Sequence, residues 1–180
     1  MKTATKKQTM PLAYAQRVAG RVVELLAPYC ERIEIAGSIR RERPHVGDIE
    51  IVCIPQTVEV PDGMFNTKLV RHPGFIDQVQ QWQKVKGKPT GKYTQRILPD
   101  GTKLDLFIAS EDNWGLILAI RTGSARFSHQ VLARSWVACG FHSKDGLLVR
   151  ERTGFKPPIR SEEELFELIG LAWVEPRGRQ

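Results

Sequence analysis

The chain has 180 residues with a formal net charge of +7 and 41% hydrophobic residues, a length suited to one domain or two small lobes. This composition excludes a disordered or fibrous chain, and the excess of positive charge favours a polyanionic partner. No apolar run approaches the ~20 residues of a membrane span and no signal-peptide pattern opens the sequence, so we expect no membrane partner and a cytoplasmic location, the host cytoplasm if a virus or phage encodes the chain.

The amino-terminal part of the chain predicts a tail, a helix and two strands. Residues 1–9 contain three lysines among polar residues and are typical of a solvated basic tail. Apolar residues recur at helical spacing over 11–26, which predicts an amphipathic helix. Extended runs at 33–36 and 49–54 predict two strands, joined by a polar, arginine-rich connection that begins at Gly37.

The middle of the chain predicts a short helix, a basic loop and a hairpin. Residues 75–82 have a short helical pattern. A stretch interrupted by glycine and proline follows and predicts a mobile loop, which carries Lys84, Lys86, Lys88 and Lys92. Strand patterns over 93–98 and 103–109 flank residues 99–101, whose Pro-Asp-Gly sequence is typical of a tight hairpin turn.

The last third of the chain predicts helices and a short strand. Helical patterns cover 114–120 and 127–139, with a Thr-Gly break between them and Gly140 at the usual C-terminal stop position. Residues 147–150 predict a strand. Ser161, followed three residues later by a glutamate, predicts the capping box of a last helix.

These elements predict an α+β fold in two lobes. A mixed α/β lobe is expected over 10–110 and a mainly helical lobe over 111–180. The three cysteines are odd in number and far apart in the sequence, which argues against a disulfide framework and against a Cys-rich zinc site.

Three acidic side chains are expected on one face of the sheet. Alternation along the second strand sends Ile49 and Ile51 to one face and Asp48 and Glu50 to the other, about 6.6 Å apart along the chain. Asp105 projects in the same way from a strand with apolar neighbours. Like charges on one face are unfavourable unless a cation or solvent lies between them. If the strands pair, the three carboxylates suit two Mg²⁺ ions and a phosphoryl displacement.

An acid pair on a strand is also common on the solvent side of an amphipathic sheet, so the acids alone leave two interpretations open. The segment upstream favours the chemical one. A Gly-Ser turn at 37–38 lets backbone and a small hydroxyl approach phosphate oxygens, and the arginines that follow supply planar, charged donors. Phosphate donors and metal ligands then come from one short segment.

The motifs around the Gly-Ser turn and the acids resemble those of a known protein family. Gly-Ser-Ile-Arg-Arg at 37–41 and Gly-Asp-Ile-Glu at 47–50 resemble the nucleotidyltransferase signature of the DNA polymerase β superfamily and, more narrowly, the family X DNA polymerases. Lys-Leu-Asp-Leu-Phe at 103–107 and Thr-Gly-Ser-Ala-Arg-Phe at 122–127 follow in the family's order. The resemblance implies a compact form with palm and thumb only: a palm with a mixed or antiparallel sheet and flanking helices over 10–110, and a small helical and β thumb over 111–180.

The resemblance also implies an activity and a site. The chain would be a template-dependent DNA polymerase that adds dNMP to a primer 3′-hydroxyl by two-metal-ion phosphoryl transfer, in short-gap DNA repair. Asp48, Glu50 and Asp105 would be the catalytic and metal-binding acids, holding two Mg²⁺ ions that Mn²⁺ can replace, with Asp105 nearest the primer hydroxyl. The implied partners are gapped or primer-template DNA and a dNTP, and we expect a monomer. The nucleotide would be held by Gly37, Ser38, Arg41, Gly47, Arg121, Thr122, Gly123 and Ser124.

Departures from the family pattern keep two other functions open. Glu50 stands where family X polymerases normally have Asp, and Ile120-Arg121 stands where they usually have an aromatic pair. The first departure favours transfer of a nucleotide to RNA or a small molecule. Both together favour a catalytically impaired module that only binds DNA.

Basic residues predict the nucleic-acid contacts. The four lysines of the loop at 84–92 are suited to track phosphates without reading bases, although a merely solvated loop has the same pattern. Arg126 and Arg134 lie on or near the helix that would face the template.

Overall fold

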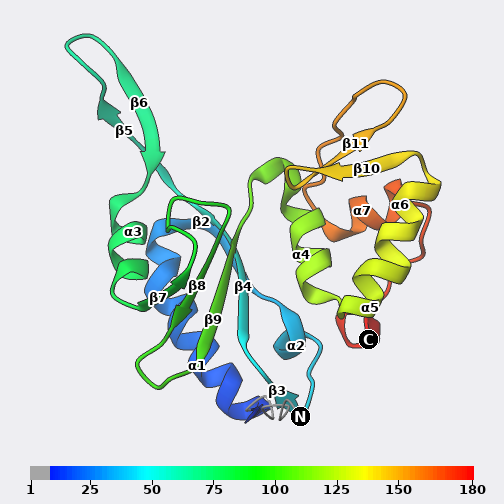
Figure 1. Cartoon of the computed structure of the whole chain (residues 1–180), viewed down its shortest axis with the longest axis horizontal. Helices are drawn as coiled ribbons and strands as arrows, with labels where there is room; N and C mark the ends of the chain where they lie inside the picture. The colour runs from blue at the N-terminus through cyan, green and yellow to red at the C-terminus, as the bar shows by residue number, and fades with distance from the viewer. Residues whose placement is uncertain (1–8) are drawn as a thin grey trace, which may run out of the picture.

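The computed structural model describes residues 9–180, and its centre is a five-stranded mixed sheet (Figure 1). The strands lie in the order β2 (Cys30–Ile35), β4 (Ile49–Pro55), β9 (Lys103–Ile108), β8 (Tyr93–Ile97) and β7 (Gln83–Lys86). β4 and β9 run parallel, and the other neighbouring pairs are antiparallel. The predicted α+β class is confirmed, and the sheet with its flanking helices is compatible with a nucleotidyltransferase-like fold.

Helices α1 (Leu12–Leu26) and α3 (Pro73–Gln80) cover one face of this sheet. Their apolar residues pack in one cluster with alternate residues of the central strands, including Ile49, Ile51, Cys53, Leu104 and Leu106. Because side chains alternate along a strand, the residues between these point to the opposite face. The predicted apolar face of β4 and β9 is therefore confirmed, and Glu50 and Asp105 lie on the opposite face.

The opposite face meets helix α4 (Trp114–Thr122). Val52 and Phe107 pack there in a smaller apolar cluster with Trp114 and Leu118. This cluster joins the sheet lobe, which comprises the five-stranded sheet with α1, α2 and α3, to the helical lobe, which comprises the elements from α4 onward. The two lobes stand side by side in Figure 1, with α4 between the sheet and the other helices.

The helical lobe has an apolar core of its own. After α4 come α5 (Ala125–Phe127), a π-helical stretch (Ser128–Ala133) and α6 (Arg134–Ala138). An antiparallel hairpin of β10 (Phe141–Lys144) and β11 (Leu147–Arg150) precedes α7 (Glu162–Leu168). Short 3₁₀ turns lie at Ala27–Tyr29, Glu111–Asn113 and Pro176–Gly178.

Small elements complete the sheet lobe. The single turn α2 (Gly37–Arg40) follows β2, and β1 (Met10–Pro11) pairs with β3 (His45–Val46). The hairpin of β5 (Thr57–Pro61) and β6 (Thr67–Arg71) projects away from the rest of the molecule (Figure 1). This hairpin is missing from the predicted elements, although Val58 and Val60 alternate with polar residues in β5, and most of its residues are exposed.

Most predicted elements are confirmed within a few residues. Residues 99–101 form the turn between β8 and β9, and Gly140 ends α6 with a positive φ of 74°. Ser161 caps α7 by accepting from Glu164 N at 3.2 Å, but the Glu164 carboxylate accepts from Arg160 N instead of closing the predicted capping box. Cys30, Cys53 and Cys139 are free, as expected.

The loop predicted for Lys84 and Lys86 is wrong, because both residues belong to β7. All of β7 is exposed at the sheet edge, so its pairing with β8 leaves no periodic apolar signal in the sequence. Lys88 and Lys92 lie in the connection between β7 and β8, as predicted.

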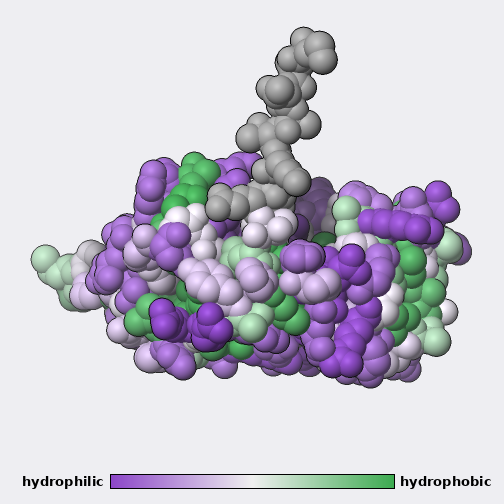
Figure 2. All heavy atoms as spheres, turned by 90° about the horizontal axis from the view of Figure 1, so that it is seen from below, coloured by the Kyte–Doolittle hydropathy of each residue, from purple (hydrophilic) through white to green (hydrophobic). Residues whose placement is uncertain are grey.

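The boundary between lobes at residues 110 and 111 stays a prediction. Of the basic tail predicted at 1–9, residues 1–8 lie outside the described part of the chain. Across residues 9–180, no helix combines the length and the apolarity that a membrane crossing requires. Figure 2, a view from below, shows hydrophilic residues over much of the surface with separate apolar patches between them.

Candidate functional site

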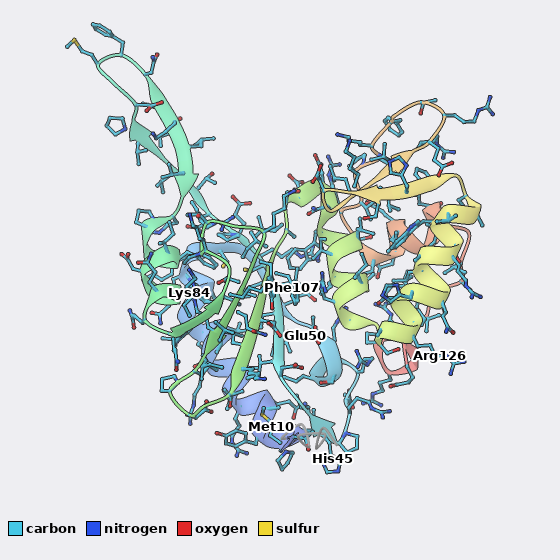
Figure 3. All side chains as sticks on the ribbon, in the orientation of Figure 1. Met10, His45, Glu50, Lys84, Phe107 and Arg126 are labelled. Carbon is cyan, nitrogen blue, oxygen red and sulfur yellow. The ribbon has the colours of Figure 1, made fainter. Side chains whose placement is uncertain are left out.

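Glu50 and Asp105 face each other across the central pair of parallel strands. They are register partners of β4 and β9, and they come from the face that is not packed on α1 and α3. Glu50 is partly buried and Asp105 is 8% exposed. In Figure 3, Glu50 and Phe107 both lie on the part of the sheet turned toward the helical lobe. The structure thus brings together the two strand acids that the sequence predicted on one face.

Asp48 precedes β4 instead of lying in the strand, and it is partly buried. Its negative charge still raises the pKa of Glu50. Burial, together with the charges of Asp48 and Asp105, raises the pKa of Glu50 to about 7, against the lowering effect of Arg121 and Arg41. The charges of Asp48 and Asp105 therefore affect the ionisation of Glu50, and the Glu50 carboxyl is partly protonated near neutral pH.

The donor set has the right chemistry for a hard divalent cation, because carboxylate oxygens are the ligands that Mg²⁺ and Mn²⁺ prefer. Among residues 9–180, however, no three His, Cys, Asp or Glu side chains are arranged as a metal site. The predicted metal role of Asp48, Glu50 and Asp105 therefore stays a prediction.

Asp105 is held by two side chains of β8 that sequence reasoning missed. Tyr93 Oη donates to Asp105 Oδ1 at 2.6 Å, and Gln95 Nε2 donates to the same oxygen at 2.8 Å. Burial and the bond to Asp105 raise the pKa of Tyr93, so its hydroxyl keeps the proton that it donates. Alternation places both residues on one face of β8, but only the register of β8 against β9 brings them to Asp105.

Gly37 opens α2 with a left-handed φ of 61°, directly beside Glu50. A Cβ at this position would overlap Glu50 Oε2, so the glycine allows the carboxylate to lie against the backbone. Ser38 follows in the same turn, and Gly47 precedes Asp48. The predicted Gly-Ser turn thus lies directly against Glu50, one of the three acids.

The arginines after this turn bind the helical lobe. Arg41 Nη1 donates to the carbonyl oxygen of Thr122 at 2.5 Å, and Arg40 Nη1 donates to Thr122 Oγ1 at 2.7 Å. Arg40 also forms a bidentate pair with Glu162, at 2.8 and 2.7 Å. Arg41 was predicted to contact a nucleotide, and in this structure it is occupied with the backbone of the Thr-Gly turn.

Arg121 brings a cation from the helical lobe to the acids. Its guanidinium lies over the ring of Phe107, 4.0 Å from the ring centre. Burial lowers the pKa of Arg121, while the charges of Glu50 and Asp105 raise it. The arginine thus partly neutralises the acid pair, and the cation-π contact holds it there.

The Thr-Gly turn itself is mostly enclosed. Thr122 is fully buried at the end of α4. Gly123 ends the helix in an extended conformation, and Ser124 caps α5 by accepting from Phe127 N at 3.0 Å. The turn therefore lies beside Arg40 and Arg41, at the junction of the two lobes.

The predicted DNA-binding residues lie on both sides of this site. Lys84 is at the β7 edge of the sheet and Arg126 on the helical lobe, with Glu50 and Phe107 between them (Figure 3). They and the rest of the set, Lys86, Lys88, Lys92 and Arg134, are exposed. Lys92 Nζ also donates to the carbonyl oxygen of Asp145 at 2.9 Å and so links the sheet lobe to the β10–β11 hairpin. The four lysines of the set thus belong to the sheet lobe and the two arginines to the helical lobe.

Comparison with known proteins agrees with the resemblance in the sequence. No protein-family model matches the chain. The chain is 26% identical over 158 residues to DNA polymerase lambda of Rattus norvegicus, an alignment that covers 79% of this chain and 28% of the relative. The chain thus spans less than a third of the length of that protein. The similarity is distant, and it relates this chain to a DNA polymerase.

Proposed function

We propose that the protein transfers nucleotides to the 3′-hydroxyl of a DNA primer, as a compact polymerase of the family X type that acts on short gaps. The observation that carries the proposal is the pairing of Glu50 with Asp105 on the sheet face turned toward the helical lobe, next to Gly37. The distant similarity to DNA polymerase lambda supports the same conclusion.

Each residue of the site has a role in this proposal. Asp48, Glu50 and Asp105 would hold Mg²⁺ or Mn²⁺, which when bound neutralises charge on the attacking and leaving oxygens. Asp105 would take the proton of the primer hydroxyl. The turn at Gly37 and Ser38 would hold the triphosphate, together with Gly47 and with Arg41 once its bond to Thr122 is exchanged.

The remaining residues would position the nucleotide and the DNA. Arg121 lies beside the acids, and Gly123 and Ser124 follow it in the helical lobe. We expect the sugar of the nucleotide on this side. The exposed lysines of residues 84–92 and the arginines at 126 and 134 would contact DNA phosphates on either side, without reading bases.

Primer extension on single-nucleotide-gapped DNA tests the proposal. Each dNTP and each ribonucleotide is supplied separately with Mg²⁺ or Mn²⁺. We expect wild-type extension and a loss of at least about 100-fold in Asp105→Asn, because the variant keeps the size of the side chain but not its charge. Asp77→Asn, an exposed acid on α3, is the matched control and should match wild type. Equal extension by wild type and Asp105→Asn would contradict the role of Asp105.

A second candidate is a DNA-binding module without catalysis. It is favoured by the absence of a gathered three-acid metal site in residues 9–180 and by the engagement of Arg41 with Thr122. This module would bind gapped DNA with a steep salt dependence and incorporate nothing under either metal. A burst of incorporation excludes it. An enzyme that acts on RNA or a small molecule would instead extend no DNA primer and show no salt-sensitive affinity for DNA.

A further inference from the structure

The side chains of β8 donate hydrogen bonds to one oxygen of Asp105, Oδ1. Tyr93 and Gln95 both donate to Oδ1, at 2.6 and 2.8 Å, and neither of these two side chains donates to Oδ2. Because the two donors come from neighbouring positions on the same face of β8, they fix the rotation of the carboxylate about its own axis. The second oxygen, Oδ2, is held by neither of them.

Both donors lie opposite residues of β9. The Tyr93 ring stacks on Phe107, its register partner in β9, with ring centres 5.1 Å apart. Gln95 is the register partner of Asp105, so its amide reaches straight across the ladder. Phe107 in turn lies under Arg121. A hydrogen bond from a donor in one fixed rotamer restricts its acceptor more than a bond from a mobile side chain does.

We propose that Tyr93 and Gln95 are positioning residues, which hold the Oδ1 atom of Asp105 so that Oδ2 is presented to a divalent cation and the primer hydroxyl. The inference rests on the proposed function and deepens it. Both donors are neutral, so they orient the carboxylate without replacing its charge. Partners of this kind behind a metal-binding carboxylate typically change metal affinity or activity by about 10- to 100-fold when they are removed.

The test uses Tyr93→Phe, Gln95→Leu and the double variant. Tyr93→Phe keeps the ring that stacks on Phe107 and removes only the hydroxyl. Tyr14→Phe is the matched control, because Tyr14 Oη donates to Asp100 at 2.8 Å in the same way but on the α1 side of the sheet. Thermal unfolding of each variant shows whether the fold is kept, and either single variant suffices if the other does not fold.

The first measurement is titration of the full chain with Mn²⁺ by electron paramagnetic resonance, without DNA or nucleotide. We expect the double variant to bind about 10- to 100-fold more weakly than wild type, each single variant to lie between, and Tyr14→Phe to match wild type. The second is incorporation into gapped DNA, where we expect kcat to fall by a similar factor and the KM for the nucleotide to change by less than about twofold.

The outcomes separate this inference from the proposed function. Mn²⁺ affinity and kcat within about twofold of wild type in the double variant overturn the inference and leave the proposed function standing. Mn²⁺ binding that depends on Tyr93 and Gln95, with no incorporation by wild type, overturns the proposed function and supports only the part of the inference that concerns the cation. If Asp105→Asn leaves the Mn²⁺ affinity of the chain unchanged, the inference is wrong, whatever the activity.

Discussion

Arg40 and Glu162 form a bidentate ion pair between the sheet lobe and the helical lobe. The two guanidinium nitrogens of Arg40 lie 2.8 and 2.7 Å from the two carboxylate oxygens of Glu162. Glu162 is 4% exposed and also pairs with Arg179, which is fully buried. One carboxylate thus pairs with two arginines, one from each lobe, beside the Thr-Gly turn.

Replacing Glu162 with Gln should therefore destabilise the protein strongly. The change leaves the buried Arg179 without a counter-charge, and breaking a buried pair in this way typically costs about 3–5 kcal/mol. Denaturant unfolding measures the loss. Glu163→Gln is the matched control, because Glu163 is the exposed next residue of α7 and its change should stay within about 0.5 kcal/mol. Equal stability of both variants would mean that the Arg40–Glu162–Arg179 cluster contributes nothing to folding.

Glu50 should make the metal-free protein less stable as the pH rises. Its pKa is raised in the folded protein, from 4.5 to about 7, so the folded state holds the proton more tightly than the unfolded chain does. The free energy of unfolding should fall as the pH rises between about 4.5 and 7, by up to about 3 kcal/mol for this group.

Unfolding in a chelator at several pH values measures this effect, with Glu50→Gln as reference. The difference between wild type and Glu50→Gln isolates the contribution of Glu50, because other groups titrate in both proteins. Arg121→Gln should enlarge the difference, since the Arg121 charge lowers the pKa of Glu50. Parallel pH curves for wild type and Glu50→Gln would show that the carboxyl has an ordinary pKa.

Alanine at Gly37 should impair the site more than the fold. Its φ of 61° costs an alanine about 1–2 kcal/mol, and the new Cβ would displace the Glu50 carboxylate. Gly101→Ala is the matched control, because Gly101 has a φ of 83° and no described atom lies within 4 Å of the position that a Cβ would take there. We expect similar losses of unfolding free energy but a loss of primer extension only in Gly37→Ala. Equal extension by the two variants would show that the turn needs no glycine for chemistry.

Removal of two lysines should weaken DNA binding on every sequence and flatten its salt dependence. If Lys84 and Lys86 each contact a phosphate, the slope of log K against log salt should fall by about 0.9 per residue in a Lys84→Gln, Lys86→Gln double variant. Arg21→Gln removes the charge of an exposed residue of α1 and should keep the wild-type slope. Fluorescence anisotropy over a salt series is the measurement. An unchanged slope in the double variant would show that Lys84 and Lys86 do not contact DNA phosphates.

Local patterns were enough for the strand faces and for the turns. The alternation of Ile49 and Ile51 with Glu50 predicts which side of β4 is apolar, because successive side chains on a strand point to opposite faces whatever the partner strand is. The Pro-Asp-Gly turn at 99–101 and the stop at Gly140 depend on backbone conformations that few other residues adopt. These features need no knowledge of distant residues.

The partners of the site residues depended on contacts between distant segments. Arg41 is separated by 81 residues from the carbonyl that it binds, and Arg40 by 122 residues from Glu162. No spacing rule in the sequence predicts such pairs, because they exist only when α2 meets the end of α4 and the start of α7. Tyr93 and Asp105 meet for the same reason, since a shift of one residue in the register of β8 against β9 would turn the hydroxyl to the other face. Folding therefore decides which charges lie around Glu50, and with them its pKa.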